Sequence, residues 1–247
     1  MAHPHPSFLP VPAPVFKSDE VPESNIIHFI AFLPLHITTT LISMPYSYQR
    51  SKILHNTFLT QEKARFTAIR AITSYDRTPG THGAKLTQII PGLWTAHFND
   101  IKEKDAFLKL TEITPPMGLV VNAAVAYDQC ATCPGYYGPD VEVMMIDLFD
   151  DPKEGEAHTC AGDAKQYFKP VNAKIKSTIE SGKSVLVHCM ASLSRSVVLI
   201  IAYLMESKGL SSLDATIMLK SVWDPTWPND RFVRELIEFE DELKVEV

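Results

Sequence analysis

The chain has 247 residues, of which 45% are hydrophobic, so it can build one substantial core with an appendage. Its formal net charge of −6 argues against a nucleic-acid-binding protein, which needs clustered positive charge to replace the counterions of phosphate. Nothing in the sequence resembles a polybasic patch for binding a membrane surface.

The cysteines indicate the compartment. The chain has four, Cys130, Cys133, Cys160 and Cys189, which are too few and too unevenly spaced for a disulfide scaffold. We therefore expect a reducing compartment, the cytoplasm or the nucleus. The N-terminus lacks the basic region, apolar run and cleavage site of a signal peptide, so none is predicted.

Residues 1–83 are predicted to form an extension that is largely disordered or weakly ordered. Prolines are too dense in residues 1–25 for regular structure, and a short helix is predicted around residues 60–72. Residues 26–44 are 19 residues without a charged side chain, which is long enough to span a bilayer. Two histidines, one proline and three threonines disfavour insertion, so an apolar extension is preferred to a membrane anchor.

Residues 84–247 are predicted to form a single α/β domain. Strands are expected at 85–90, 93–98, 118–124, 141–149 and 184–188. Helices are expected at 101–112, 161–182, 195–207, 210–222 and 229–243, with Ser211 or Ser212 and Asn229 as N-caps of the last two. Strands that alternate with helices predict a mainly parallel central sheet flanked by helices.

The stretch SVLVHCMASLSRSVV at 184–198 indicates chemistry. A buried strand ends at Cys189, a loop of small residues follows, and a helix begins near Arg195. Ligands of open α/β sheets bind at the carboxyl ends of strands, so the amides of loop 190–194 are expected to surround an oxyanion. Such a site favours the thiolate of Cys189, and the planar guanidinium of Arg195 can hold two phosphate oxygens. This pattern predicts phosphoryl transfer to sulfur. The predicted phosphate-binding residues are Met190, Ala191, Ser192, Leu193, Ser194 and Arg195.

His188 precedes Cys189 on the predicted strand. Adjacent strand side chains point to opposite faces, so His188 is not expected to act as the base of a protease-type Cys–His pair. It is expected to form hydrogen bonds behind the loop and to shape it.

The sequence VHCMASLSRS, followed by AYLM, LSSLDATIMLKS, PNDRF and FEDEL, resembles the small, atypical dual-specificity protein phosphatases of the cysteine-based protein tyrosine phosphatase superfamily. The resemblance covers roughly residues 84–243. It implies an enzyme that hydrolyses phosphotyrosine and phosphoserine/phosphothreonine in proteins, without a metal or cofactor. It also implies that Cys189 is the nucleophile, that Arg195 binds phosphate, and that Ser196 helps to discharge the thiolate. The alternative for Ser196 is that it only caps the helix.

The resemblance extends to MMIDLFDDP, which matches the family's strand followed by Asp-x-Pro. Asp150 is therefore the predicted general acid, which later activates water. Asp151, Asp163 and the absence of a general acid remain alternatives. Residues 152–162 look like an insertion in this loop, which leaves its closure open.

The chain departs from the family at Ser192, where the family has glycine. Glycine adopts a positive φ freely, whereas serine does so with strain on the order of 1 kcal/mol. The alternative function is therefore a catalytically impaired, phosphatase-like module that binds phosphopeptides. A phosphatase acting on phosphoinositides or RNA 5′-phosphates is not expected, because the loop has no added basic residue. The oligomeric state is left open.

A second group of residues, Cys130, Cys133, His158 and Cys160, is predicted to lie in loops at strand ends. Four such ligands suit tetrahedral zinc, but the spacing of His158 and Cys160 is not standard for zinc, so reduced thiols are the preferred interpretation and no metal is predicted. A regulatory disulfide between Cys160 and Cys189 is a further alternative.

Overall fold

The structure, a computed structural model, describes residues 46–73, 86–101, 113–123, 137–150 and 163–245. The chain divides into two compact units, Met1–Asn56 and Thr57–Val247. Apart from the first residues of helix α3, all features discussed below belong to the second unit. Several predictions concern residues outside the described ranges, namely the stretch 26–44, most of the helix at 101–112, Asp151, Cys130, Cys133, His158 and Cys160.

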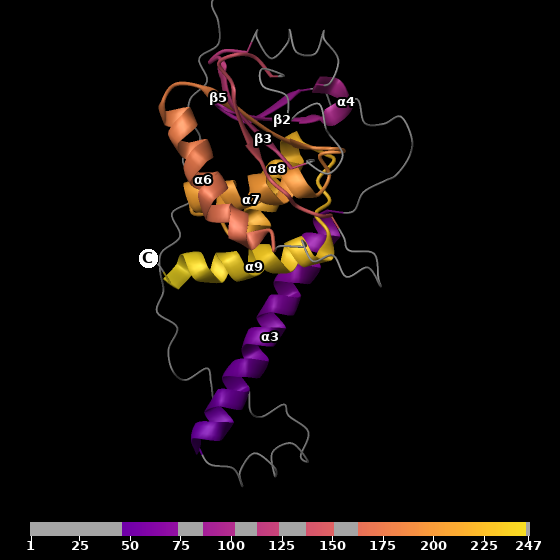
Figure 1. The fold of residues 1–247 in the computed structure, drawn as a ribbon. Helices are drawn as coiled ribbons and strands as arrows, with labels where there is room; N and C mark the ends of the chain where they lie inside the picture. The colour runs from indigo at the N-terminus through magenta and orange to yellow at the C-terminus, as the bar shows by residue number, and fades with distance from the viewer. Residues whose placement is uncertain (1–45, 74–85, 102–112, 124–136, 151–162, 246–247) are drawn as a thin grey trace, which may run out of the picture. The chain divides into compact units, whose positions relative to one another are not determined.

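A five-stranded sheet forms the centre of the described fold (Figure 1). Its strands are β1 (Thr87–Ile90), β2 (Leu93–His97), β3 (Met117–Asn122), β4 (Glu142–Met145) and β5 (Ser184–Cys189), in the order β1-β2-β5-β3-β4. β1 and β2 are antiparallel, and the other three neighbouring pairs are parallel. The predicted α/β fold with a mainly parallel sheet is confirmed.

The described helices are α3 (Tyr46–Ile72), α4 (Phe98–Ile101), α6 (Lys165–Glu180), α7 (Arg195–Lys208), α8 (Ser212–Val222) and α9 (Asp230–Val245) (Figure 1). Helix α7 is buried from Arg195 to Met205, as its uninterrupted apolar sequence predicts. It ends at Gly209, whose left-handed φ of 64° suits a residue without a side chain. Among the described residues, no single helix is long and apolar enough to cross a bilayer. Helices α7 and α8 together are long and apolar enough, but their axes are bent by 118° relative to one another.

Strand β5 separates two hydrophobic clusters. Val185, Val187 and Cys189 lie in the larger cluster, together with most of α7. Leu186 lies in the smaller cluster, which includes Ala96 of β2. Successive side chains of a strand point to opposite faces, so this division places Cys189 on the α7 side of the sheet.

Helix α3 is longer than the predicted helix at 60–72, and its C-terminal part packs on α9. Ile69 is fully buried with Val233 and Ile237 of α9, and Phe66 packs beside them. Arg65 donates two hydrogen bonds to Asp241, at 2.7 and 2.9 Å. The compact unit therefore begins at Thr57, N-terminal to the predicted boundary at residues 83 and 84, which itself falls outside the described ranges.

Candidate active site

The site is built around Cys189, the last residue of β5. Because β5 pairs in parallel with both β2 and β3, its carboxyl end opens at the middle of the sheet edge. Cys189 is not in a disulfide, and the residue is only 1% exposed. The hydroxyl of Ser196, in the first turn of α7, donates a hydrogen bond to the Cys189 sulfur at 3.5 Å. The predicted nucleophile and the residue predicted to stabilise its thiolate are thus in contact.

The loop from Met190 to Ser194 is held to the surrounding protein through its carbonyl groups. Three of these carbonyls accept hydrogen bonds from outside the loop: Met190 O from Phe98 N at 3.0 Å, Ser192 O from Trp223 Nε1 at 2.8 Å, and Leu193 O from Trp227 N at 2.8 Å. A trans peptide directs its N–H opposite to its C=O. The N–H groups that follow these carbonyls therefore point toward the concave side of the loop, where they can bind an oxyanion.

Ser192 has the backbone conformation that the family's glycine predicts. Its φ is 47°, and no other non-glycine residue among those described has a positive φ. Its buried hydroxyl donates to the carbonyl of Ala96 at 2.5 Å and accepts from the N–H of Cys189 at 3.3 Å. These bonds fasten the strained residue to β2 and to the nucleophile.

Arg195 is the first residue of α7, and its side chain is 7% exposed. Its Nε lies 3.7 Å from Oδ2 of Asp150, whose side chain is 46% exposed. The structure thus places the predicted phosphate-binding cation beside the predicted general acid. Asp163, the second alternative acid, is exposed just before α6, where its carbonyl accepts a hydrogen bond from Gln166 Nε2 at 3.0 Å.

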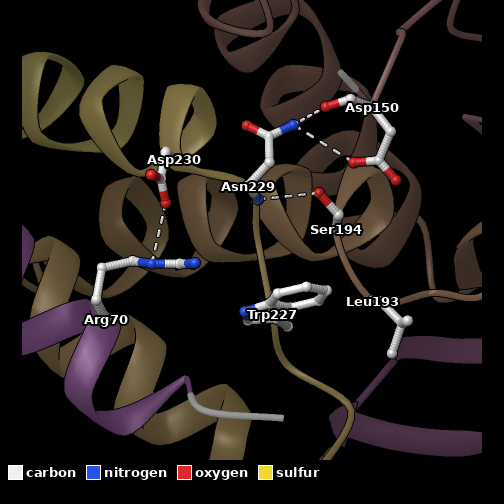
Figure 2. A pocket seen from close by; sticks show the side chains of 7 residues that line it. All are labelled: Arg70, Asp150, Leu193, Ser194, Trp227, Asn229 and Asp230. Carbon is white, nitrogen blue, oxygen red and sulfur yellow. Dashed lines mark hydrogen bonds and ion pairs between the residues drawn. The ribbon is translucent and has the colours of Figure 1, made fainter. Parts of the chain in front are cut away.

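Asn229 connects three parts of the site (Figure 2). Its Oδ1 accepts from the N–H of Phe232 at 2.9 Å, which confirms the predicted N-cap of α9. Its backbone N–H donates to Ser194 Oγ of the loop at 3.1 Å, and its side-chain amide donates to the carbonyl of Asp150. The sequence indicated only the cap. The link to the acid could not be read from spacing, because 79 positions separate the two residues.

Arg231 adds a second connection between α9 and the acid segment. Its Nη2 donates to the carbonyl of Phe149 at 2.9 Å. Its neighbour on the same helix face, Glu235, accepts from the backbone N–H of Lys165 at 3.1 Å. Arg231 and Glu235 of α9 therefore bond the chain on both sides of segment 152–162, the predicted insertion, which lies outside the described ranges.

His188 lies behind the loop, as predicted. It is fully buried, its Nε2 is hydrogen-bonded to the hydroxyl of Tyr137 at 2.8 Å, and its ring stacks with Phe98 at a centroid distance of 6.1 Å. Burial lowers the pKa of His188 to about 4, so the imidazole is neutral at pH 7. Its Nδ1 lies 3.4 Å from the carbonyl of Cys189, so it supports the peptide that follows the nucleophile.

A pocket of about 370 Å³ opens beside the loop (Figure 2). It is lined by Arg70, Asp150, Leu193, Ser194, Trp227, Asn229 and Asp230. Arg70 comes from the last turns of α3, and its Nη1 donates to the carbonyl of Pro228 at 2.7 Å. Among the described residues, no group of three or more His, Cys, Asp or Glu side chains could hold a metal ion.

Comparison with known proteins shows that the chain is similar to dual specificity phosphatases. The model of the dual specificity phosphatase catalytic domain matches residues 116–242. The chain is 29% identical over 162 residues to dual specificity protein phosphatase 1B of Arabidopsis thaliana, an alignment that covers 66% of this chain and 86% of that protein. It is 32% identical over 113 residues to human dual specificity phosphatase 28, which covers 46% of this chain and 60% of that protein.

Solved structures of dual specificity phosphatases are also similar to this chain. The chain superposes on the crystal structure of human DUSP28 with a TM-score of 0.52 and 26% identity, covering 64% of this chain and 95% of that one. A mouse protein crystallised with zinc tungstate and described as a dual specificity phosphatase gives a TM-score of 0.53 at 25% identity, covering 70% of this chain and 94% of that one.

Proposed function

The chain is a protein phosphatase of the dual specificity phosphatase family, and from this premise we propose that it hydrolyses phosphotyrosine and phosphoserine/phosphothreonine through a cysteinyl-phosphate on Cys189. Its substrates are phosphorylated proteins. The observation that carries the proposal is the hydrogen bond from Ser196 to the Cys189 sulfur. It lies beside a loop whose carbonyls at Met190, Ser192 and Leu193 accept hydrogen bonds from the surrounding protein, which leaves the following N–H groups to bind phosphate.

In the first step, the thiolate of Cys189 attacks phosphorus in line with the leaving oxygen. A sulfur–phosphorus bond forms and the phosphorus–oxygen bond breaks. The loop amides and the guanidinium of Arg195 hold the equatorial oxygens, where charge develops. Asp150, next to Arg195 and 46% exposed, donates a proton to the departing oxygen.

In the second step, water attacks the phosphorus of the cysteinyl-phosphate. The Asp150 carboxylate takes a proton from that water, and the sulfur–phosphorus bond breaks. The Ser196 hydroxyl donates to the sulfur as negative charge returns to it, from the 3.5 Å position that it occupies here. Inorganic phosphate leaves, and the free thiolate is restored.

The alternative function, a module that binds phosphopeptides without turnover, is not favoured. The chain's relatives are dual specificity phosphatases, and Ser192 adopts the positive φ expected of the family's glycine. Strain at one residue, on the order of 1 kcal/mol, can slow the reaction without removing any predicted catalytic group.

The proposal is tested with the full chain and an aryl phosphate. Rapid quenching followed by mass spectrometry should find a phosphoryl group on the peptide that contains Cys189, and Cys189→Ser should release no phosphate. Tungstate, a tetrahedral oxyanion, should compete with the substrate in the wild type. Tight phosphopeptide binding by a wild type that releases no phosphate in a single turnover would instead establish the binding module.

The four cysteines lead us to propose that the protein works in the cytoplasm or the nucleus. The net charge of −6 leads us to propose that nucleic acid is not a partner, and the histidines, proline and threonines of residues 26–44 that a membrane is not one either. Imaging of the full chain fused to a fluorescent protein tests the location. Accumulation at a membrane would contradict it and would favour the anchor alternative for residues 26–44.

A further inference from the structure

The pocket beside the phosphate loop has one wall that the family domain does not supply. Arg70 lies on α3, N-terminal to the matched residues 116–242, whereas Leu193 and Ser194 are part of the loop itself. Asp150 lines the same pocket. A peptide whose phosphorylated residue occupies the loop therefore has a neighbouring residue within reach of this pocket.

The charged groups of the pocket are already matched within the protein. Nε of Arg70 lies 3.1 Å from the carboxylate of Asp230, and Nε of Arg195 lies 3.7 Å from that of Asp150. A cationic side chain of a substrate would have to compete with Arg70 for Asp230, and an anionic one would have to compete with Asp230 for Arg70. The pocket thus offers little net attraction to either sign of charge.

The apolar part of the lining is Leu193 and Trp227, and the uncharged polar residues Ser194 and Asn229 are already hydrogen-bonded to one another. Figure 2 shows the indole of Trp227 between Arg70 and Leu193. The Arg70 guanidinium carbon lies 5.9 Å from the centroid of the indole ring, and the backbone of Trp227 is held by the 2.8 Å hydrogen bond to Leu193. An indole face beside a guanidinium plane binds another aromatic ring by stacking and by cation–π attraction.

We propose that this pocket, bounded by Arg70 and Trp227, binds an aromatic side chain that lies close in sequence to the phosphorylated residue of the substrate. The proposal rests on the proposed function, since it assumes that a phosphorylated residue enters the loop. It assigns substrate selectivity to α3, an element outside the matched family domain.

The test uses phosphotyrosine peptides with alanine at the three positions on either side, into which one Phe, Lys or Glu is introduced at a time. For the full-length wild type, kcat/KM should rise about twofold to tenfold when Phe is placed at one of these positions. Lys and Glu should give no such rise. The affinity of the Cys189→Ser chain for the same peptides is measured in parallel and should follow the same order.

Three variants locate the selectivity. Trp227→Leu removes the flat face but keeps an apolar side chain, and Arg70→Ala removes the guanidinium. Both should bring the Phe-to-Ala ratio of kcat/KM toward one. Arg65→Ala is the matched control, because Arg65 lies on the same helix and pairs with Asp241 but does not line the pocket. It should keep the wild-type ratio.

Several results would overturn the proposal: equal kcat/KM for Phe and Ala peptides, a preference for Lys or Glu, a Phe preference that survives both pocket variants, or one that Arg65→Ala also abolishes. If the wild type fails to hydrolyse even a small aryl phosphate, the proposed function fails. The affinity series on Cys189→Ser still decides the pocket, because binding needs no turnover.

Discussion

The hydroxyl of Ser192 donates to the carbonyl of Ala96 at 2.5 Å, which joins the phosphate loop to the end of β2. The same oxygen accepts from the N–H of Cys189, so one side chain orders both the strained turn and the nucleophile. The serine that replaces glycine therefore brings two effects of opposite sign. It strains the backbone, and it supplies two buried hydrogen bonds that glycine cannot make.

Comparing Ser192→Ala with Ser192→Gly separates these effects. Alanine keeps the strain and leaves the Ala96 carbonyl and the Cys189 N–H without these bonds, so we expect a loss of about 2 kcal/mol in unfolding free energy and a clear fall in kcat/KM. Glycine loses the same bonds but relieves the strain, and should be about 1 kcal/mol more stable than alanine. Urea unfolding and aryl phosphate hydrolysis measure both. A glycine variant more active than the wild type would show that strain, rather than the lost bonds, controls the rate.

The sequence was sufficient to predict the elements that carry strong local patterns. Strand β5, the buried helix α7 and the cap at Asn229 all follow from runs of apolar or capping residues that are read locally. It was also sufficient to place His188 and Cys189 on opposite faces, because strand geometry requires it.

The remaining features depend on contacts between distant segments. Arg70 enters the pocket only because α3 packs on α9, and no periodicity in residues 60–72 indicates that partner. The bond from Asn229 to Asp150 likewise joins two loops that are brought together by the sheet and by α9. Strand β4 is shorter than predicted, because it ends at Met145. Among the described residues, its bonding to β3 stops after the hydrogen bond from Ile146 N–H to the carbonyl of Asn122, although Leu148 and Phe149 further along are apolar.

Ser196→Ala should slow the second chemical step more than the first. Its hydroxyl bonds the sulfur, which carries negative charge when the cysteinyl-phosphate is cleaved. Loss of one hydrogen bond to a charged group should reduce that step by about tenfold or more. Rapid-quench experiments should therefore show cysteinyl-phosphate accumulating in the variant. A variant that slows both steps equally would mean that Ser196 orders the site rather than stabilising the leaving thiolate.

Asn229 can be tested as a positioning residue by two substitutions. Asn229→Asp keeps an oxygen that caps α9 but removes the amide that donates to Asp150, whereas Asn229→Ala removes both. We expect kcat to fall by about tenfold in each, because the acid is no longer held. Only the alanine variant should lose a further 1 kcal/mol or so of stability, the usual value of an N-cap. Wild-type kcat in Asn229→Asp would exclude the role.

The stability of the domain should depend on pH through His188. Burial lowers its pKa in the folded state to about 4, below the unfolded value of 6.5, so the unfolded chain binds the proton more readily. This group therefore favours folding fully above pH 6.5, and its contribution is lost as the pH falls toward 4. The loss should approach roughly 3 kcal/mol. Denaturant unfolding from pH 7 to pH 4 measures it, with His188→Asn as the control that lacks the titration. Parallel pH profiles for the two proteins would contradict the prediction.

Helix α3 should be required for the stability of the catalytic unit, since it covers a patch of α9. A chain that begins at Thr57 keeps the buried Ile69 and its contacts with Val233 and Ile237. A chain that begins at residue 84 lacks Ile69, so Val233 and Ile237 become exposed to water. The longer chain should unfold like the full-length protein. The shorter one should lose on the order of 2–4 kcal/mol, the value of burying one or two large apolar side chains.

Two single substitutions show whether packing or charge is responsible for this effect. Ile69→Ala should cost about 2–4 kcal/mol by leaving a cavity. Arg65→Ala should cost about 1 kcal/mol or less, because its partner Asp241 is part-exposed and the ion pair is screened by solvent. If the chain that begins at residue 84 is as stable as the one that begins at Thr57, then α3 contributes nothing to folding, and its only role in the unit is the wall that Arg70 forms beside the phosphate loop.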